Sequence, residues 1–543
     1  MQPSLKMADW REFINNKLLN EQFIQAYCID KKDETDVAFF SALIPNAIAA
    51  KSLKSFSWDL YIGDGQPGCN THFEGKEEVV KYHRFGGNNS VEPLVIMRDF
   101  HDIKPSYLEV SEEFRLFHNI FFDAKTGQYL KFDDSGIGEE AIRIGPKDVR
   151  IRRNLLRQFL GIKDMQLALF FDIRRFSKQT LREQGLQDGV QEFQGKNFSY
   201  SLGIGNWDGF LGDGRKSLSR LCGKIMLDGL KKSETGFWPY EKPEKHEDFI
   251  IGQDEAGNSI VHTSDPDKLS NYFSTKPGAA HYLTPVFFRR EVLGKYYGNS
   301  ELYSVEDGYL RCAGLWGLHI DNNHEQYVVV FLGDLGRDLP QAERSYWKSF
   351  NVLPEGKISA VNFKRSFLAQ FTDPTRADLC FKHLFESFQK AWIHKYGWSL
   401  FKPLSKQDEH CFTTLRIPLN DSQSEFDNQV LSLAKIIIDS LNEDELAHRI
   451  NAPLPRDAKG ITKLEKFLEV QGAGEAKEHI KFLRSLWDLR HGAGHRKGTG
   501  YEKAAQYFNT NERDLRTVFQ EILDKAIALI KFLGENLPKG DMD

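Results

Sequence analysis

An arginine and two histidines lie close together near the end of the chain, in the stretch LWDLRHGAGHRKG that covers residues 486–498. They are Arg490, His491 and His495. A guanidinium group presents a planar fork of N–H donors to a phosphate, and an imidazole exchanges protons near neutral pH. This set of side chains is therefore suited to binding a phosphate group and moving protons beside it.

The residues before Arg490 follow the pattern of an amphipathic helix. Arg490 comes four residues after Leu486 and three after Trp487, so we expect it to continue the apolar stripe. A charged group there requires a partner, because an unpaired buried charge costs several kcal/mol. The stripe itself consists of Ile480, Leu483, Leu486 and Trp487.

A second interpretation of the same stretch needs no chemistry. Gly492 would end the helix, and Arg496 and Lys497 would face the negative end of its dipole. That interpretation does not explain why an arginine continues the apolar stripe. His495 follows Arg490 by five residues, about 140° around an ideal helix, so a kinked turn is needed to bring the two side chains together.

The elements around this stretch are predicted to be helical. The segment PLNDSQS at 418–424 is a polar, turn-forming linker, and the pattern after it has helical period without a strand signal. Four helical segments joined by short connections predict a bundle in residues 421–543. The segments are 425–442, 461–471, 475–491 and 511–535.

The first 420 residues mix strand and helix patterns. Hairpins are predicted within 113–134, which turns at DAKTGQ, and within 246–265, and an apolar strand is predicted at 327–332. We therefore predict the α+β class, with strand-rich N-terminal and middle regions followed by an all-α bundle. The expected divisions are an α+β region at 1–175, a middle α+β region at 176–420 that is a possible sensor, and the bundle at 421–543.

A run of cations at residues 147–157 has two interpretations. Lys147, Arg150, Arg152, Arg153 and Arg157 lie in a segment whose apolar residues indicate a short amphipathic helix. The cations then form either a solvated helix face or a surface that contacts phosphates.

The middle region holds other polar residues that could form a site. Asp334 and Asp338 follow the apolar strand, where carboxylates can be catalytic, but both are also good turn residues. His319 and His324 flank Asp321, without the residue spacing of a zinc site. We predict structural roles and no bound metal; a metal-dependent enzyme with its site here is an alternative.

Composition limits the classes of partner. A net charge of −5 over 543 residues argues against a chain that coats nucleic acid over its whole surface. Residues 472–505 nevertheless carry seven Lys or Arg against four Asp or Glu, a local balance of +3 that favours an anionic substrate. Arg496, Lys497 and Lys503 are candidates for contacts with a nucleic-acid backbone.

Location is predicted from apolar runs and cysteines. The N-terminus lacks the apolar core of a secretion signal, and the longest apolar runs are far short of the roughly 20 residues of a membrane helix. The six cysteines include no CxxC pair and are expected to be reduced thiols. These features predict a cytoplasmic protein with no membrane association.

The C-terminal segment resembles the HEPN superfamily, on the motif Arg490-His491-Gly-Ala-Gly-His495 within a helical bundle. Members of that superfamily carry an arginine and a histidine separated by four to six residues, often with a polar residue directly after the arginine. The resemblance covers about residues 424–538. The Gly-Ala-Gly between the two anchors departs from the commoner form.

The resemblance implies a metal-independent endoribonuclease that needs no cofactor. His495 would exchange a proton with the 2′-hydroxyl or the leaving 5′-oxygen, Arg490 would hold the scissile phosphate, and His491 would orient it or act as a second acid or base. The products would be a 2′,3′-cyclic phosphate and a 5′-hydroxyl. HEPN bundles typically pair about a two-fold axis, so a homodimer is expected.

By analogy with bacterial defence proteins, the expected biology is abortive infection. RNA cleavage would arrest a phage-infected cell, and the N-terminal region would respond to a phage-derived trigger or another regulatory partner. A non-catalytic HEPN bundle used for dimerisation or RNA binding is the other alternative.

Overall fold

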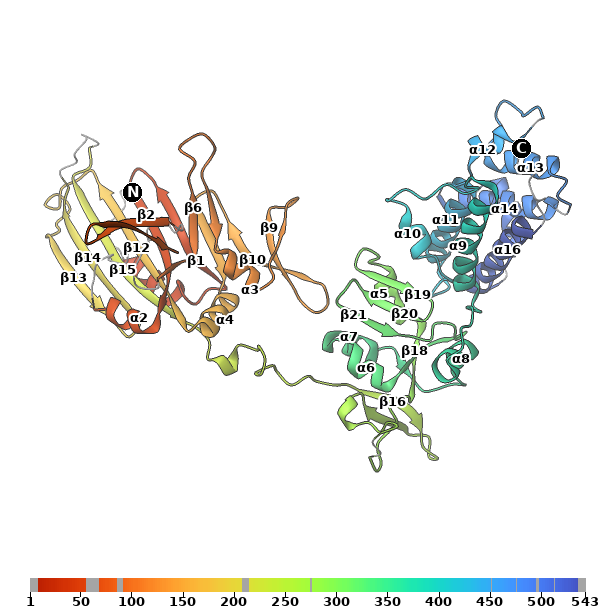
Figure 1. The fold of residues 1–543 in the computed structure, drawn as a ribbon, viewed down its shortest axis with the longest axis horizontal. Helices are drawn as coiled ribbons and strands as arrows, with labels where there is room; N and C mark the ends of the chain where they lie inside the picture. The colour runs from red at the N-terminus through yellow and green to blue at the C-terminus, as the bar shows by residue number, and fades with distance from the viewer. Residues whose placement is uncertain are drawn as a thin grey trace. The chain divides into compact units, whose positions relative to one another are not determined.

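The computed structural model of the protein describes residues 8–54, 68–84, 91–207, 214–273, 276–450, 452–474, 476–494, 498–511 and 513–535. The chain forms two compact units. The first contains residues 1–133 and 137–243, and the second contains residues 134–136 and 244–543. The strands gather in the first unit and in the early part of the second, and the helices predominate after residue 376 (Figure 1).

The first unit is built on an 11-stranded antiparallel sheet. The order is β13-β14-β15-β12-β2-β1-β11-β10-β9-β8, and β5 pairs with β2 beside this path. The strands are β1 (Phe23–Lys31), β2 (Thr35–Pro45), β5 (Glu92–Pro93), β8 (Phe121–Asp123), β9 (Gln128–Phe132), β10 (Gly138–Ile144), β11 (Asp148–Arg152), β12 (Met165–Ser177), β13 (Gly189–Gln194), β14 (Phe198–Asn206) and β15 (Ser217–Asp228).

Strand β12 is buried on both faces, which explains its nearly continuous apolar sequence. Successive side chains of a strand point to opposite faces. Leu167, Leu169 and Phe171 belong to the larger core, into which α4 (Arg153–Lys163) also inserts its apolar side, while Ala168 and Phe170 belong to a smaller core on the other face. The short amphipathic helix predicted for the cationic run at 147–157 begins only at Arg153, and Asp148–Arg152 before it form strand β11.

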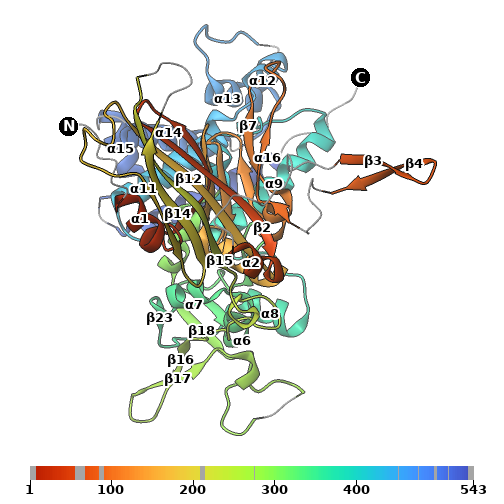
Figure 2. The ribbon, with the colours of Figure 1, turned by 90° about the vertical axis from the view of Figure 1, so that its left-hand side faces the viewer.

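Shorter elements surround the large sheet. Helix α3 (Glu112–Phe117) occupies a segment that we expected to be a strand, whereas β8 and β9 form the hairpin predicted there. The hairpin of β3 (Gly68–Glu74) and β4 (Glu77–His83) extends away from the sheet (Figure 2). The other small elements are α1 (Ala8–Glu12), η1 (Phe13–Lys17), α2 (Asn46–Ser52), β6 (Val95–Arg98), β7 (Tyr107–Val110) and η2 (Lys232–Glu234).

The second unit begins with small antiparallel sheets around one apolar core. Two of them have the orders β22-β18-β23 and β19-β20-β21, and β16 pairs with β17 in the predicted hairpin. The strands are β16 (Asp248–Gln253), β17 (Ser259–Thr263), β18 (Pro285–Arg289), β19 (Tyr303–Glu306), β20 (Tyr309–Cys312), β21 (Trp316–His319), β22 (Tyr327–Phe331) and β23 (Asn351–Val352). Its helices are η3 (Pro266–Lys268), η4 (Arg290–Leu293), α5 (Gly294–Tyr297), α6 (Leu332–Asp338), α7 (Gln341–Lys348) and α8 (Ala360–Leu368).

Helices form the rest of the second unit around their own apolar core. The long helices α9 and α16 pack against each other (Figure 1). Helix α14 packs against α11, α13 and α15. The elements are α9 (Ala377–Tyr396), α10 (Glu409–Thr413), α11 (Gln423–Ala434), η5 (Lys435–Asp439), α12 (Glu443–His448), α13 (Gly460–Val470), α14 (Ala476–Gly494), α15 (Thr499–Phe508) and α16 (Leu515–Glu535).

The predicted α+β class is confirmed, since strand-rich regions precede a helical C-terminal region. The observed units differ in extent from the expected divisions: residue 175 falls within β12, and α9 precedes residue 420 but packs on α16. Among the described residues, every helix falls short of the length and hydropathy needed to cross a membrane.

Candidate functional site

Helix α14 carries the candidate residues at its C-terminal end. Ile480, Leu483 and Leu486 are buried, as the helical spacing predicts. The helix runs past Gly492 to Gly494, three residues beyond the end predicted at residue 491. Arg490 and His491 consequently lie within the last turns of a long helix that neighbouring helices hold in place.

Arg490 lies at the edge of the apolar stripe instead of within it. At this level of the helix Leu489 is the fully buried residue, with 1% of its surface exposed. The Arg490 side chain keeps 27% of its surface exposed and forms an ion pair with Asp439, whose side chain is 31% exposed. Within the described part of the chain, this is the one polar partner of the guanidinium.

Asp439 reaches Arg490 from the end of η5, a π-helical turn that follows α11. A π turn contains more residues than an α turn, so consecutive side chains spread over a narrower arc. This geometry lets Ile436, Ile437 and Ile438 all be buried in the core while Asp439 faces solvent. Asp439 was not among the residues predicted from the sequence, because it lies 51 residues from Arg490 and belongs to no local motif.

His491 is oriented by Trp487, one turn earlier on α14. Its Nδ1 lies 3.1 Å from the carbonyl oxygen of Trp487, and the two ring centroids are 3.7 Å apart. A carbonyl oxygen only accepts, so Nδ1 carries the hydrogen. In the neutral ring, Nε2 is then the nitrogen without a hydrogen, and its lone pair can accept a proton.

The remaining residues of the predicted site are His495, Arg496, Lys497 and Lys503. His495, Arg496 and Lys497 lie outside the described residues. Lys503 is exposed on α15, which packs against α14. The first turn of α15 approaches α14 closely at Gly500, where an added Cβ would lie 3.3 Å from a carboxylate oxygen of Asp488. Lys503 is thus carried on a helix that lies beside Arg490 and His491.

Of the polar residues that the sequence singled out in the middle region, some line a cavity and others do not. His319, Asp321 and Asp334 line a cavity of about 520 Å³, together with Tyr309 and Arg365. Neither His324 nor Asp338 lines it. The Nδ1 of His324 accepts from the backbone N–H groups of Gln326 and Tyr327, and Asp338 pairs with Arg337.

All three carboxylates that line this cavity have partners within the protein. Asp321 accepts from the backbone N–H and the hydroxyl of Ser359, both at 2.7 Å, and so orders the start of α8. Asp307 pairs with Arg365 at 2.6 Å. Asp334 accepts from the Tyr282 hydroxyl at 3.0 Å. Burial raises the pKa of Asp334.

These partners suit structural roles better than metal binding. Among the described residues, no group of three or more His, Cys, Asp or Glu side chains is arranged to hold a metal ion. His319 and Asp334, which the sequence singled out separately, nevertheless meet at one cavity. Comparisons of the chain with models of protein families, with curated proteins and with solved structures found no match.

Proposed function

We propose that the protein is a metal-independent endoribonuclease whose site lies at the C-terminal end of α14. Arg490 would bind the scissile phosphate, His495 would be a general acid or base, and His491 would orient the phosphate or act as the second acid or base. Arg496, Lys497 and Lys503 would contact the RNA backbone. The 2′-hydroxyl of the RNA would be the nucleophile, and the chain would need no cofactor.

One observation carries this proposal: the ion pair with Asp439 holds Arg490 in place without occupying all of its N–H donors. Asp439 engages Nη1 of the guanidinium, and the side chain keeps 27% of its surface exposed. A held guanidinium with further N–H groups facing solvent is preorganised to receive an anion.

The adjacent imidazole fits the same chemistry. The Trp487 ring packs against the imidazole of His491, and the Trp487 carbonyl oxygen accepts a hydrogen bond from Nδ1, so the lone pair of the neutral ring lies on Nε2. The local excess of cations in residues 472–505 favours RNA over a neutral substrate. A homodimer through the helical bundle would bring two such helix ends to one cleft.

The biology we propose is antiviral defence by abortive infection in the cytoplasm. The residues before the helical bundle would hold the enzyme quiet until a phage-derived signal or another partner arrives. A non-catalytic bundle that binds RNA or mediates dimerisation is the rival that the assay must exclude.

The test uses purified full-length protein and a labelled RNA in EDTA. Cleavage is expected with the wild type and is expected to fall at least about 100-fold in both Arg490→Ala and His495→Ala, the usual cost of removing such groups. Arg484→Ala is the matched control, because Arg484 lies on the same helix, is half exposed and pairs with Glu465. RNA binding by the wild type without cleavage supports the non-catalytic rival.

A second assay tests the proposal when the purified enzyme is held inactive by its own N-terminal region. Expression in bacterial cells together with the trigger, or at high level, is expected to stop growth, and His495→Ala is expected to restore it. Growth arrest that persists in both His495→Ala and Arg490→Ala would contradict the proposed site.

A further inference from the structure

The cavity of about 520 Å³ in the second unit is lined by residues of β22, the end of β21 and α8. A volume of this size suits a small molecule. His319 and Ser366 belong to its lining and are exposed, so the cavity opens to solvent. None of the described residues assigned to the proposed ribonuclease site lines it.

Part of the lining is apolar. It consists of buried side chains from β22, from α8 and from the residue after β21, namely Ile320, Val329, Val330, Phe331 and Val361. Removal of apolar surface from water is favourable. This part of the cavity therefore favours a ligand with a hydrocarbon body.

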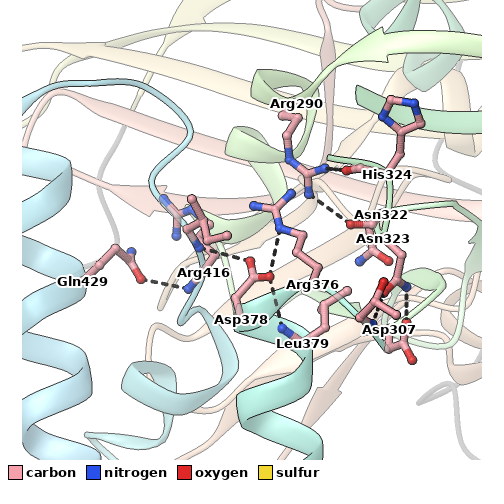
Figure 3. A network of polar contacts seen from close by, with 12 residues as sticks. Arg290, Asp307, Asn322, Asn323, His324, Arg376, Asp378, Leu379, Arg416 and Gln429 are labelled. Carbon is pink, nitrogen blue, oxygen red and sulfur yellow. Dashed lines mark hydrogen bonds and ion pairs between the residues drawn. The ribbon is translucent and has the colours of Figure 1, made fainter. Parts of the chain in front are cut away.

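The charged part of the lining carries more negative than positive charge. Three carboxylates and one guanidinium group belong to it, those of Asp307, Asp321, Asp334 and Arg365. Asp307 is neutralised by Arg365 at 2.6 Å, and it also accepts from the Asn323 amide at 2.7 Å (Figure 3). Within the described chain, both partners of Asp321 are groups of Ser359, which is neutral. The balance favours a cation as the ligand and disfavours an anion.

Asp334 has one carboxylate oxygen without a partner. Oδ1 accepts from the Tyr282 hydroxyl and from Arg337, both at 3.0 Å. Arg337 also donates two hydrogen bonds to Asp338, so its charge is shared between two carboxylates. Oδ2 of Asp334 accepts no hydrogen bond from a described residue and retains accessible surface, although the side chain is only 10% exposed.

The charge of Asp334 is incompletely compensated. Burial raises the pKa of this carboxyl group in spite of its hydrogen bond from Tyr282 and the nearby charge of Arg337. A buried carboxylate is stabilised by a cation that donates hydrogen bonds to it. The oxygen available to such a cation is Oδ2, on the residue that lines the cavity.

We propose that this cavity binds a small organic cation, with a primary ammonium group at Oδ2 of Asp334 and a hydrocarbon body against the apolar lining. An ammonium group has three donors and no acceptor, so it matches an unpartnered carboxylate oxygen. A metal ion is a poorer match, because no group of three or more His, Cys, Asp or Glu side chains among the described residues is arranged to hold one. The proposal is independent of the proposed ribonuclease activity.

The experiment is a calorimetric titration of the full chain with 2-phenylethylamine, pentylamine and 2-phenylethanol, at constant pH and ionic strength. The alcohol replaces the ammonium group by a neutral hydroxyl. Saturable binding is expected for at least one amine, with affinity for 2-phenylethanol at least tenfold lower than for 2-phenylethylamine. Asp334→Asn is expected to weaken amine binding at least tenfold, because charge-assisted hydrogen bonds are about twice as strong as neutral ones.

The matched control is Glu355→Gln, which is expected to bind the amines as the wild type does. Glu355 also accepts from a tyrosine hydroxyl, that of Tyr327 at 2.7 Å, but it is exposed and does not line the cavity. Thermal melting of each variant without ligand separates loss of binding from loss of folding. Amine is expected to raise the melting temperature of the wild type and of Arg490→Ala, but not of Asp334→Asn.

A second variant places a competing ammonium group in the cavity. His319 is exposed, its ring packs against Tyr309 with centroids 4.7 Å apart, and it lies close enough for its charge to act on Asp334. His319→Lys would put a primary ammonium group beside Asp334, so it is expected to weaken amine binding at least tenfold. His319→Gln, which adds no charge, is expected to bind amines with wild-type affinity.

Any of four results would overturn the proposal. The first is absence of binding by both amines at millimolar concentration, and the second is equal affinity for 2-phenylethanol and 2-phenylethylamine. The third is wild-type affinity in Asp334→Asn, or in His319→Lys if Asp334→Asn does not fold. The fourth is loss of amine binding in Arg490→Ala with retention in Asp334→Asn, which would move the amine away from this cavity.

Discussion

Replacing Asp439 by asparagine tests whether this carboxylate holds Arg490 for chemistry rather than for stability. Both side chains of the pair are roughly one-third exposed. Ion pairs that solvent reaches contribute about 0–1 kcal/mol, so Asp439→Asn is expected to lower the free energy of unfolding by no more than about 1 kcal/mol. The melting temperature would then fall by less than about 4 °C.

The effect on cleavage is expected to be larger than the effect on folding. An arginine side chain carries about 2 kcal/mol of rotamer entropy, which Asp439 removes in advance of substrate binding. If the substrate phosphate had to supply all of that ordering, the rate would fall about 30-fold, since each 1.36 kcal/mol is a factor of ten. We therefore expect kcat for RNA cleavage to fall between about 5-fold and 30-fold.

The assay pairs single-turnover cleavage of a labelled RNA with urea unfolding of the same preparations. Glu465→Gln is the matched control, because it breaks the ion pair between Glu465 of α13 and Arg484, which lies on α14 together with Arg490. Cleavage by Asp439→Asn at the wild-type rate would refute a positioning role. A stability loss above about 3 kcal/mol would show that the pair supports the packing of η5 against α14 instead.

Two further predictions concern stability. His118 is buried, its Nε2 donates to the carbonyl oxygen of Leu155 at 2.8 Å, and burial first, then the charge of Lys131, lower its pKa to about 4. The folded pKa lies below the unfolded value of about 6.5, so the contribution of neutral His118 to the free energy of unfolding is fully present above pH 6.5 and is lost as pH falls toward 4, by up to about 3 kcal/mol. The variant His118→Gln keeps a donor but does not titrate, so it should flatten that part of the pH profile in urea unfolding. An unchanged profile would contradict the assignment. An added Cβ at Gly336 would lie 1.7 Å from the carbonyl oxygen of Ser264, so Gly336→Ala should destabilise the second unit by about 3 kcal/mol, whereas Gly314→Ala, which has open space, should have little effect in thermal melting.

The periodic spacing of apolar residues identified most of the helices and strands that could be predicted from the sequence. The spacing of Ile480, Leu483 and Leu486 identified both α14 and its buried side. The same spacing predicted Arg490 on the buried stripe, but Arg490 lies at its edge. The buried residues Phe482, Leu486 and Leu489 define a stripe that is shifted slightly around the helix. Helix α15 was missed because its short apolar pattern directly follows a glycine-rich stretch, where no helix was expected.

Long-range pairing could not be predicted in the same way. Strand β12 pairs with β15 on one side and with β2 on the other, and β2 is more than 100 residues earlier in the chain. Apolar alternation identifies a strand but does not name its neighbours. For the same reason the sequence showed a chemically suitable arginine without its partner, since the Asp439–Arg490 pair depends on how α11, η5 and α14 pack.

The most direct test of the central claim is the chemistry of the RNA ends. Mass spectrometry of RNA cut by the full-length protein in EDTA is predicted to show 2′,3′-cyclic phosphate and 5′-hydroxyl ends, and none of these ends with His495→Ala or with a substrate whose 2′-hydroxyl is removed at the cleavage position. Ends that carry a 3′-hydroxyl and a 5′-phosphate, or cleavage that requires a divalent metal, would contradict the account.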